Sequence, residues 1–113
     1  MEIRIRSLDD VIVVEPIGRI TIDSGSARIH ERIRQLVGQG QNRLVVDLAR
    51  VGYMDSTGVG SLVASYTTTV NSGGRIILLK PNEKVEYLLS ITNLLKVFEI
   101  FQDEHDAVTS FSG

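Results

Sequence analysis

The sequence contains no cysteine, which excludes disulfide bonds and thiolate chemistry. A chain without cysteine fits a reducing compartment. Its longest apolar runs are about four residues long, far too short to cross a membrane. Residues 1–10 alternate charged and aliphatic side chains, unlike a signal peptide. These absences predict a cytoplasmic protein without membrane insertion.

Charge of one sign is also lacking, because the formal net charge is only -2 and no basic run occurs. A nucleic-acid partner is therefore not expected. The phosphate-binding pattern G-x-x-x-x-G-K-[ST] is absent. The acidic residues within 103–106 are adjacent in sequence and would not converge on one ion. We expect neither a cofactor nor a metal ion.

The sequence has few residues suited to catalysis. His30 and His105 are its only histidines, and neither belongs to a recognisable triad. Ser56 does not lie in a G-x-S-x-G motif, because Met54 occupies the first glycine position. The chain is therefore predicted not to be an enzyme.

The composition is that of an ordinary globular protein. Hydrophobic residues make up 42% and charged residues 23% of the 113 residues, enough for one domain with a single core. No linker, repeat or low-complexity segment interrupts the chain. A single domain over residues 1–113 is predicted.

Hydrophobic periodicity predicts alternating strands and helices. Short β-branched or apolar runs predict strands at 2–6, 11–14, 44–48, 76–79 and 97–101. Spacings of three and four residues predict helices over 29–37 and 59–70, with two further helices starting near Asn82 and Asp103. Ser24 and Ser26 are candidate N-caps of the first helix. This order predicts a mostly parallel α/β sheet of about five strands, with the first strand added antiparallel at an edge through a turn at 8–10.

A small polar stretch, Asp55-Ser56-Thr57-Gly58, separates the strand at 44–48 from the helix at 59–70. Functional groups gather at the carboxyl ends of parallel strands. Ser56 is expected at or next to the N-cap of the helix, where an added anion is tolerated. Small residues would leave the outward side of this helix open to a docking partner or modifying enzyme: Thr57, Gly58, Gly60, Ser61, Ala64 and Ser65. The simpler alternative is that Asp55 and Ser56 only cap the helix.

The segments 46–48, 53–60 and 88–100, together with Gly73-Gly74, resemble the STAS domain, the fold of bacterial anti-sigma factor antagonists. The similarity spans roughly residues 3–110. It implies a STAS fold, with helices packed on a mixed sheet, and a partner-switching role in transcription regulation. In that family a partner that is both anti-sigma factor and serine kinase phosphorylates the serine after the aspartate. The unphosphorylated antagonist binds this partner and releases a sigma factor, and a serine phosphatase resets the cycle.

Carried over by position, the resemblance makes Ser56 the phosphorylated residue. The start and outward side of its helix, with the loop at 19–26, would bind the partner through Asp55, Thr57, Gly58, Gly60, Ser61, Thr21, Asp23 and Ser24. Many antagonists have G-E-[LI]-D where this chain has Gly18-Arg19-Ile20-Thr21. Thr21 thus replaces an aspartate that helps engage the kinase, and Asp23 could substitute for it.

A second hypothesis stays within the same fold. Some STAS proteins are accessory subunits of transport or other signalling complexes and dock without phosphorylation. The serine at position 56 favours the switch, and Thr21 leaves the transport hypothesis open. The sequence identifies neither the sigma factor nor the oligomeric state, for which a monomer and a weak dimer both remain open.

Overall fold

The chain begins with an antiparallel hairpin in the computed structural model, which describes residues 1–112. Strand β1 (Glu2–Leu8) pairs with β2 (Val11–Ile20) through a two-residue turn at which Asp9 has a positive φ of 56°. This confirms the predicted turn at 8–10 and the antiparallel first strand. Gly113, the last residue of the predicted domain, lies outside the described residues.

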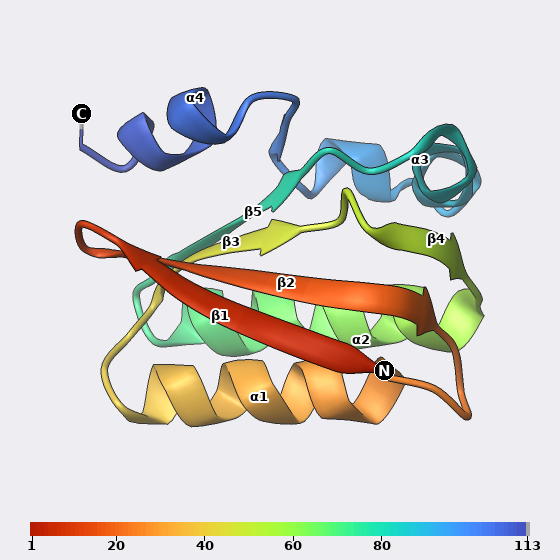
Figure 1. Ribbon diagram of the computed structural model, residues 1–113, viewed down its shortest axis with the longest axis horizontal. Helices are drawn as coiled ribbons and strands as arrows, with labels where there is room; N and C mark the ends of the chain where they lie inside the picture. Colours follow the sequence, from red (N-terminus) through yellow and green to blue (C-terminus); the bar gives the residue numbers. More distant parts are fainter. Residues whose placement is uncertain (113) are drawn as a thin grey trace.

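Strands and helices then alternate along the chain, as Figure 1 shows. The elements are α1 (Ser26–Gly38), β3 (Arg43–Asp47), β4 (Val51–Met54), α2 (Ser56–Asn71), β5 (Arg75–Leu79), α3 (Glu83–Ile91), a short 3-10 helix (Leu94–Lys96), β6 (Ile100–Phe101) and α4 (Glu104–Thr109). No helix within residues 1–112 is both long and apolar enough to cross a membrane.

The sheet has the order β1-β2-β3-β5-β6, with β4 paired to β2 alone. Its pairs are parallel except for β1 with β2, which confirms the predicted mixed sheet with an antiparallel edge strand. The sheet has six strands where about five were predicted, because β4 was not expected from the sequence. Strand β2 runs on to Ile20, so its first half pairs with β3 and its last residues pair with β4.

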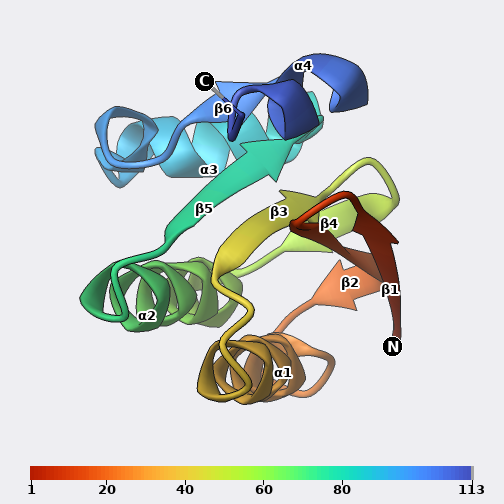
Figure 2. The same cartoon turned by 90° about the vertical axis from the view of Figure 1, so that its left-hand side faces the viewer.

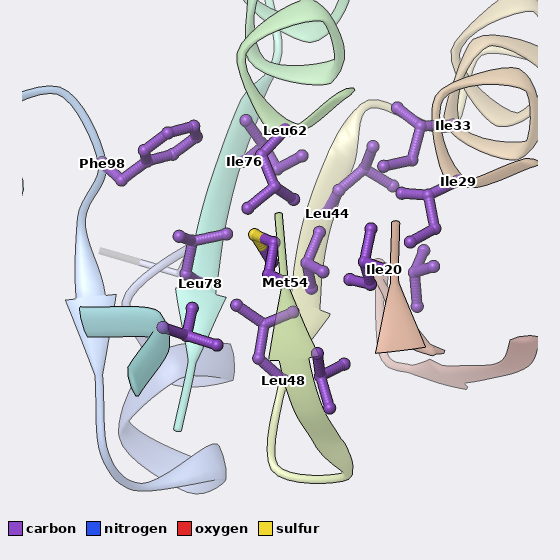
Figure 3. Packing of buried hydrophobic residues seen from close by; sticks show 14 of the residues in the cluster. Ile20, Ile29, Ile33, Leu44, Leu48, Met54, Leu62, Ile76, Leu78 and Phe98 are labelled. Carbon is purple, nitrogen blue, oxygen red and sulfur yellow. The ribbon is translucent and has the colours of Figure 1, made fainter. Parts of the chain in front are cut away.

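The sheet is buried on both faces. Alternate residues of β2, β3 and β5, such as Val14, Val46 and Leu78, pack in one core cluster with residues of α1 and α2. The intervening residues, such as Val45 and Ile77, pack with Ala107 and Phe111 on the opposite face. Figure 2 shows α1 and α2 side by side on their face, and Figure 3 shows the larger cluster. Burial on both faces explains why these strands read as continuous apolar runs.

Two local predictions were wrong. The segment predicted as a strand at 97–101 begins with the end of a 3-10 turn, and only Ile100 and Phe101 pair with β5. Neither Ser24 nor Ser26 caps α1, because Gly25 takes the N-cap position with a positive φ of 88°. The Ser26 hydroxyl instead donates to the carbonyl of Thr57 at 2.7 Å, which joins the starts of α1 and α2.

Candidate functional site

Asp55 is the N-cap of α2, and its two carboxylate oxygens accept three hydrogen bonds. Oδ1 accepts from the backbone N–H of Gly58 at 3.0 Å and from the hydroxyl of Thr57 at 2.6 Å. Oδ2 accepts from the backbone N–H of Ile22 at 3.1 Å. One side chain therefore caps the helix and fixes the loop between β2 and α1 beside it.

These hydrogen bonds also favour the ionised form of the Asp55 carboxyl. The hydrogen bond from Thr57, with those from the N–H groups of Gly58 and Ile22, lowers the pKa of the carboxyl below its ordinary value of 3.8. A lowered pKa in the folded state contributes stability that is present above the unfolded-state pKa. That contribution is lost as the pH falls through the folded-state pKa.

An Asp55→Asn protein is therefore expected to have a lower melting temperature than the wild type at pH 7. The amide keeps an acceptor for Gly58 but has no second oxygen for the N–H of Ile22. The difference should shrink as the pH falls from about 4, the pKa of the carboxyl in the unfolded chain, through the lower pKa of the folded state, where the wild-type carboxyl becomes protonated. Thermal unfolding of both proteins between pH 7 and pH 2.5 measures it, and a difference that stays constant would contradict the assigned charge.

Ser56 is the first residue of α2, next to the cap, as predicted. Its side chain is exposed, and its hydroxyl has no hydrogen-bond partner within residues 1–112. The neighbouring hydroxyl of Thr57 is engaged with Asp55. Capping is therefore the role of Asp55, and the Ser56 hydroxyl remains free at the helix N-terminus.

Three of the six small residues that were predicted on the outward side of α2 are buried, so the prediction was wrong for these three. Gly58, Ser61 and Ser65 are buried, and the latter two hydroxyls donate to backbone carbonyls of their own helix at 2.8 and 2.7 Å. Helix α1 lies alongside, where His30 Nε2 is 3.3 Å from the hydroxyl of Thr68. Gly58 faces the sheet instead, because a Cβ atom there would lie 2.5 Å from the carbonyl oxygen of Ile20. Gly58 and Ser61 therefore lie beneath the surface of the protein rather than on it.

Gly60 and Thr57 keep some of the predicted accessibility: Gly60 is exposed, and Thr57 is partly exposed. Both lie in the first turn and a half of α2. The accessible part of α2 near the site is therefore smaller than predicted and lies at the start of the helix.

Thr21 does not lie on the rim of the surface, as had been predicted, because it is 4% exposed. Its hydroxyl donates to Asp23 Oδ1 at 2.9 Å, and its backbone exchanges hydrogen bonds with Ser24. Thr21 thus shapes the turn from inside. Asp23 is exposed and Ser24 is partly exposed, and the bond between Ile22 and Asp55 holds their loop against the start of α2.

Exposed apolar side chains around this point were missed from the sequence. Ile22 is 76% exposed, and Tyr53 is 47% exposed with the Arg19 guanidinium 5.6 Å from its ring centroid. Tyr53 also lines a groove of about 440 Å³ with Tyr87 and Ile91 of α3. No alternating pattern in β4 marks Tyr53, because its two exposed residues lie between two buried ones. The exposure of Ile22 depends on a loop conformation without a sequence signature.

The arrangement offers binding rather than an assembled catalytic centre. Within residues 1–112, no group of three metal-binding side chains is found. His30 contacts Thr68 in the seam between the helices, and His105 is exposed on α4. The chemistry present is a free hydroxyl at a helix N-terminus, surrounded by exposed apolar and acidic groups.

Comparison with known proteins agrees with this fold. The model of the STAS domain matches residues 2–107. A Thermotoga maritima protein named "Putative anti-sigma factor antagonist" is 30% identical over 101 residues, which cover 89% of either chain. The "Anti-sigma-B factor antagonist" of Bacillus subtilis is 29% identical over 100 residues, which cover 88% of this chain and 90% of that protein.

Solved structures give the same result. A crystal structure of a Thermotoga maritima protein, also described as a "putative anti-sigma factor antagonist", superimposes with a TM-score of 0.89 and 28% identity. The superposition covers 96% of this chain and 92% of the other. The chain therefore belongs to the STAS domain family, and its matched relatives are anti-sigma factor antagonists by name.

Proposed function

We propose that this protein is an anti-sigma factor antagonist that works as a phosphorylation-controlled binding switch. The form with a free Ser56 hydroxyl binds an anti-sigma factor that is also a serine kinase, and this binding releases a sigma factor. Phosphorylation of Ser56 breaks the complex, and a serine phosphatase restores it. The chain itself acts in the cytoplasm by binding, not by catalysis.

The observation that carries this proposal is the free hydroxyl of Ser56. The side chain is exposed and has no hydrogen-bond partner within the described residues, so modification would break no existing contact. Asp55 already caps α2, and the Thr57 hydroxyl is held by Asp55. Of the two adjacent hydroxyls, the one at Ser56 is the better phosphoryl acceptor.

The effect of the phosphoryl group would be electrostatic. Phosphorylation adds about -1.5 to -2 charges at pH 7. At the N-terminus of a helix this charge is favourable by about 0.3–1 kcal/mol, so the domain stays folded. At an interface suited to a neutral hydroxyl, an unpaired dianion would cost several kcal/mol. Because about 1.4 kcal/mol changes affinity tenfold, the complex would dissociate without a change of shape.

Affinity capture with two variants tests the switch. Ser56→Ala and Ser56→Asp proteins are used as baits in native lysate, and bound proteins are identified by mass spectrometry. We expect an ATP-binding anti-sigma factor with kinase activity on the alanine bait, reduced at least tenfold on the aspartate bait. Thr67→Asp is the matched control, because Thr67 is exposed on the same helix but far from its start.

The melting temperature of Ser56→Asp should equal or exceed that of the wild type, which separates lost binding from lost folding. Equal capture by the alanine and aspartate baits would contradict the switch. Capture of a transporter subunit by both baits would instead favour a constitutive docking role.

A further inference from the structure

Strand β1 forms one end of the sheet and leaves a long edge unpaired. It contains seven residues and pairs only with β2 in the part of the chain that the structure describes. In Figure 2, β1 lies at the margin of the molecule, above and beside α1. At the opposite end of the sheet, β6 has only two residues. An unpaired edge of this length is a template for an additional strand.

The register shows which backbone groups this edge offers. Ile3 lies opposite Pro16, which has no N–H, so these two residues cannot exchange a pair of hydrogen bonds. Hydrogen-bonded and non-hydrogen-bonded pairs alternate along an antiparallel ladder. The N–H and C=O groups of Ile3, Ile5 and Ser7 therefore point away from β2, toward the free edge.

A groove continues from this edge along the exposed side of α1. Its volume is about 610 Å³, and it is lined by Ile3, Ala27, Arg28, Glu31, Arg32 and Gln35. An added strand directs every second side chain toward one face of the sheet. Side chains of such a strand on the α1 side would enter this groove.

The charge that the groove offers comes from Arg28 and Arg32, which line it and have no acidic partner within residues 1–112. The other three arginines of β1 and α1 are held by carboxylates: Arg4 by Glu2, Arg34 by Glu31, and Arg6 by Asp47 and Glu104. Glu2 lies 2.7 Å from Arg4, and Glu31 lies 2.6 Å from Arg34. Arg32 makes only a 3.4 Å contact with Gln35.

We propose that the free edge of β1 binds an acidic, extended segment of another protein as an additional strand. The segment forms backbone hydrogen bonds with Ile3, Ile5 and Ser7. Its carboxylates on the α1 side face Arg28 and Arg32. This surface does not include Ser56 and is independent of the proposed switch.

A peptide of alternating glutamate and valine, seven residues long with blocked ends, is a suitable probe. We expect it to bind the wild-type protein, and a peptide with lysine in place of glutamate to bind at least tenfold more weakly. Amide hydrogen exchange measured by NMR with and without the peptide gives the binding mode. Exchange at Ile3, Ile5 and Ser7 should slow, while Arg4 and Arg6, already paired with β2, should change little.

Two variants of the protein test the edge and the charge separately. Ser7→Pro removes an N–H that points away from β2, so the hairpin should remain intact while peptide affinity falls about tenfold. Arg32→Glu should weaken peptide binding similarly, whereas Lys84→Glu, with the same charge change at an exposed position on α3, should have a much smaller effect. Circular dichroism checks that each variant is folded.

Several results would overturn the inference. The first is equal binding of the two peptides, and the second is peptide binding without slower exchange at the three amides. The third is an equal effect of Arg32→Glu and Lys84→Glu on peptide affinity. Concentration-dependent dimerisation through β1, detected by sedimentation, would assign the edge to a second copy instead. Ser56→Asp should leave peptide binding unchanged, so this test can fail or succeed independently of the switch.

Discussion

Replacing Gly58 by alanine is expected to destabilise the protein by about 2 kcal/mol, although alanine is the better helix former. A Cβ atom at this position would lie 2.5 Å from the carbonyl oxygen of Ile20 and 2.5 Å from Cγ of Met54. The Ile20 carbonyl belongs to the backbone of β2 and accepts a hydrogen bond from the N–H of Asp55. Relieving the clash would therefore separate the start of α2 from the sheet.

Gly60→Ala is the matched control on the same helix. No atom lies within 4 Å of a Cβ placed there, so only the gain in helix propensity remains, about 0.5–1 kcal/mol of added stability. Urea unfolding of the two variants and the wild type measures both effects. Equal stability of the two alanine variants would show that Gly58 does not make the close approach described above.

Leu62→Ala is expected to lower the free energy of unfolding by about 3 kcal/mol. Leu62 is 1% exposed and packs in the larger core cluster between α2 and the sheet, as Figure 3 shows. Truncation removes buried methyl groups and leaves a cavity that the rigid sheet cannot fill. Since α2 carries Ser56, loss of this anchor should also loosen the candidate site.

Leu95→Ala provides the control with the same chemical change at a surface position. Leu95 is 42% exposed, and its truncation should cost less than about 1 kcal/mol. Chemical denaturation of both variants gives the comparison. Similar losses at the two positions would contradict the central packing role of Leu62.

Features defined by short stretches of sequence could be predicted. The hairpin, the alternation of strands and helices, and the helix starts at Asn82 and Asp103 each depend on neighbouring residues, and the structure confirms them. The position of Asp55 and Ser56 at the start of α2 is of the same kind. Apolar runs and capping residues report local conformation directly.

Features that depend on distant residues could not be predicted. Strand β4 is four residues long, contains Gly52 and forms by pairing with the end of β2, more than thirty residues earlier. The burial of Ser61 and Ser65 depends on tertiary packing, because small residues are compatible with a buried helix face or with an open one. Thr21 is similar: its burial results from a turn whose conformation depends on the left-handed Gly25.

The hydrogen bond from the N–H of Ile22 to Asp55 has a consequence for binding. It joins the loop after β2 to the cap of α2, so the two segments that flank Ser56 are already ordered together before any partner arrives. Association then loses little conformational entropy on this side of the interface. We expect this surface to have the same geometry before and after a partner binds. The contacts across the interface then determine the affinity.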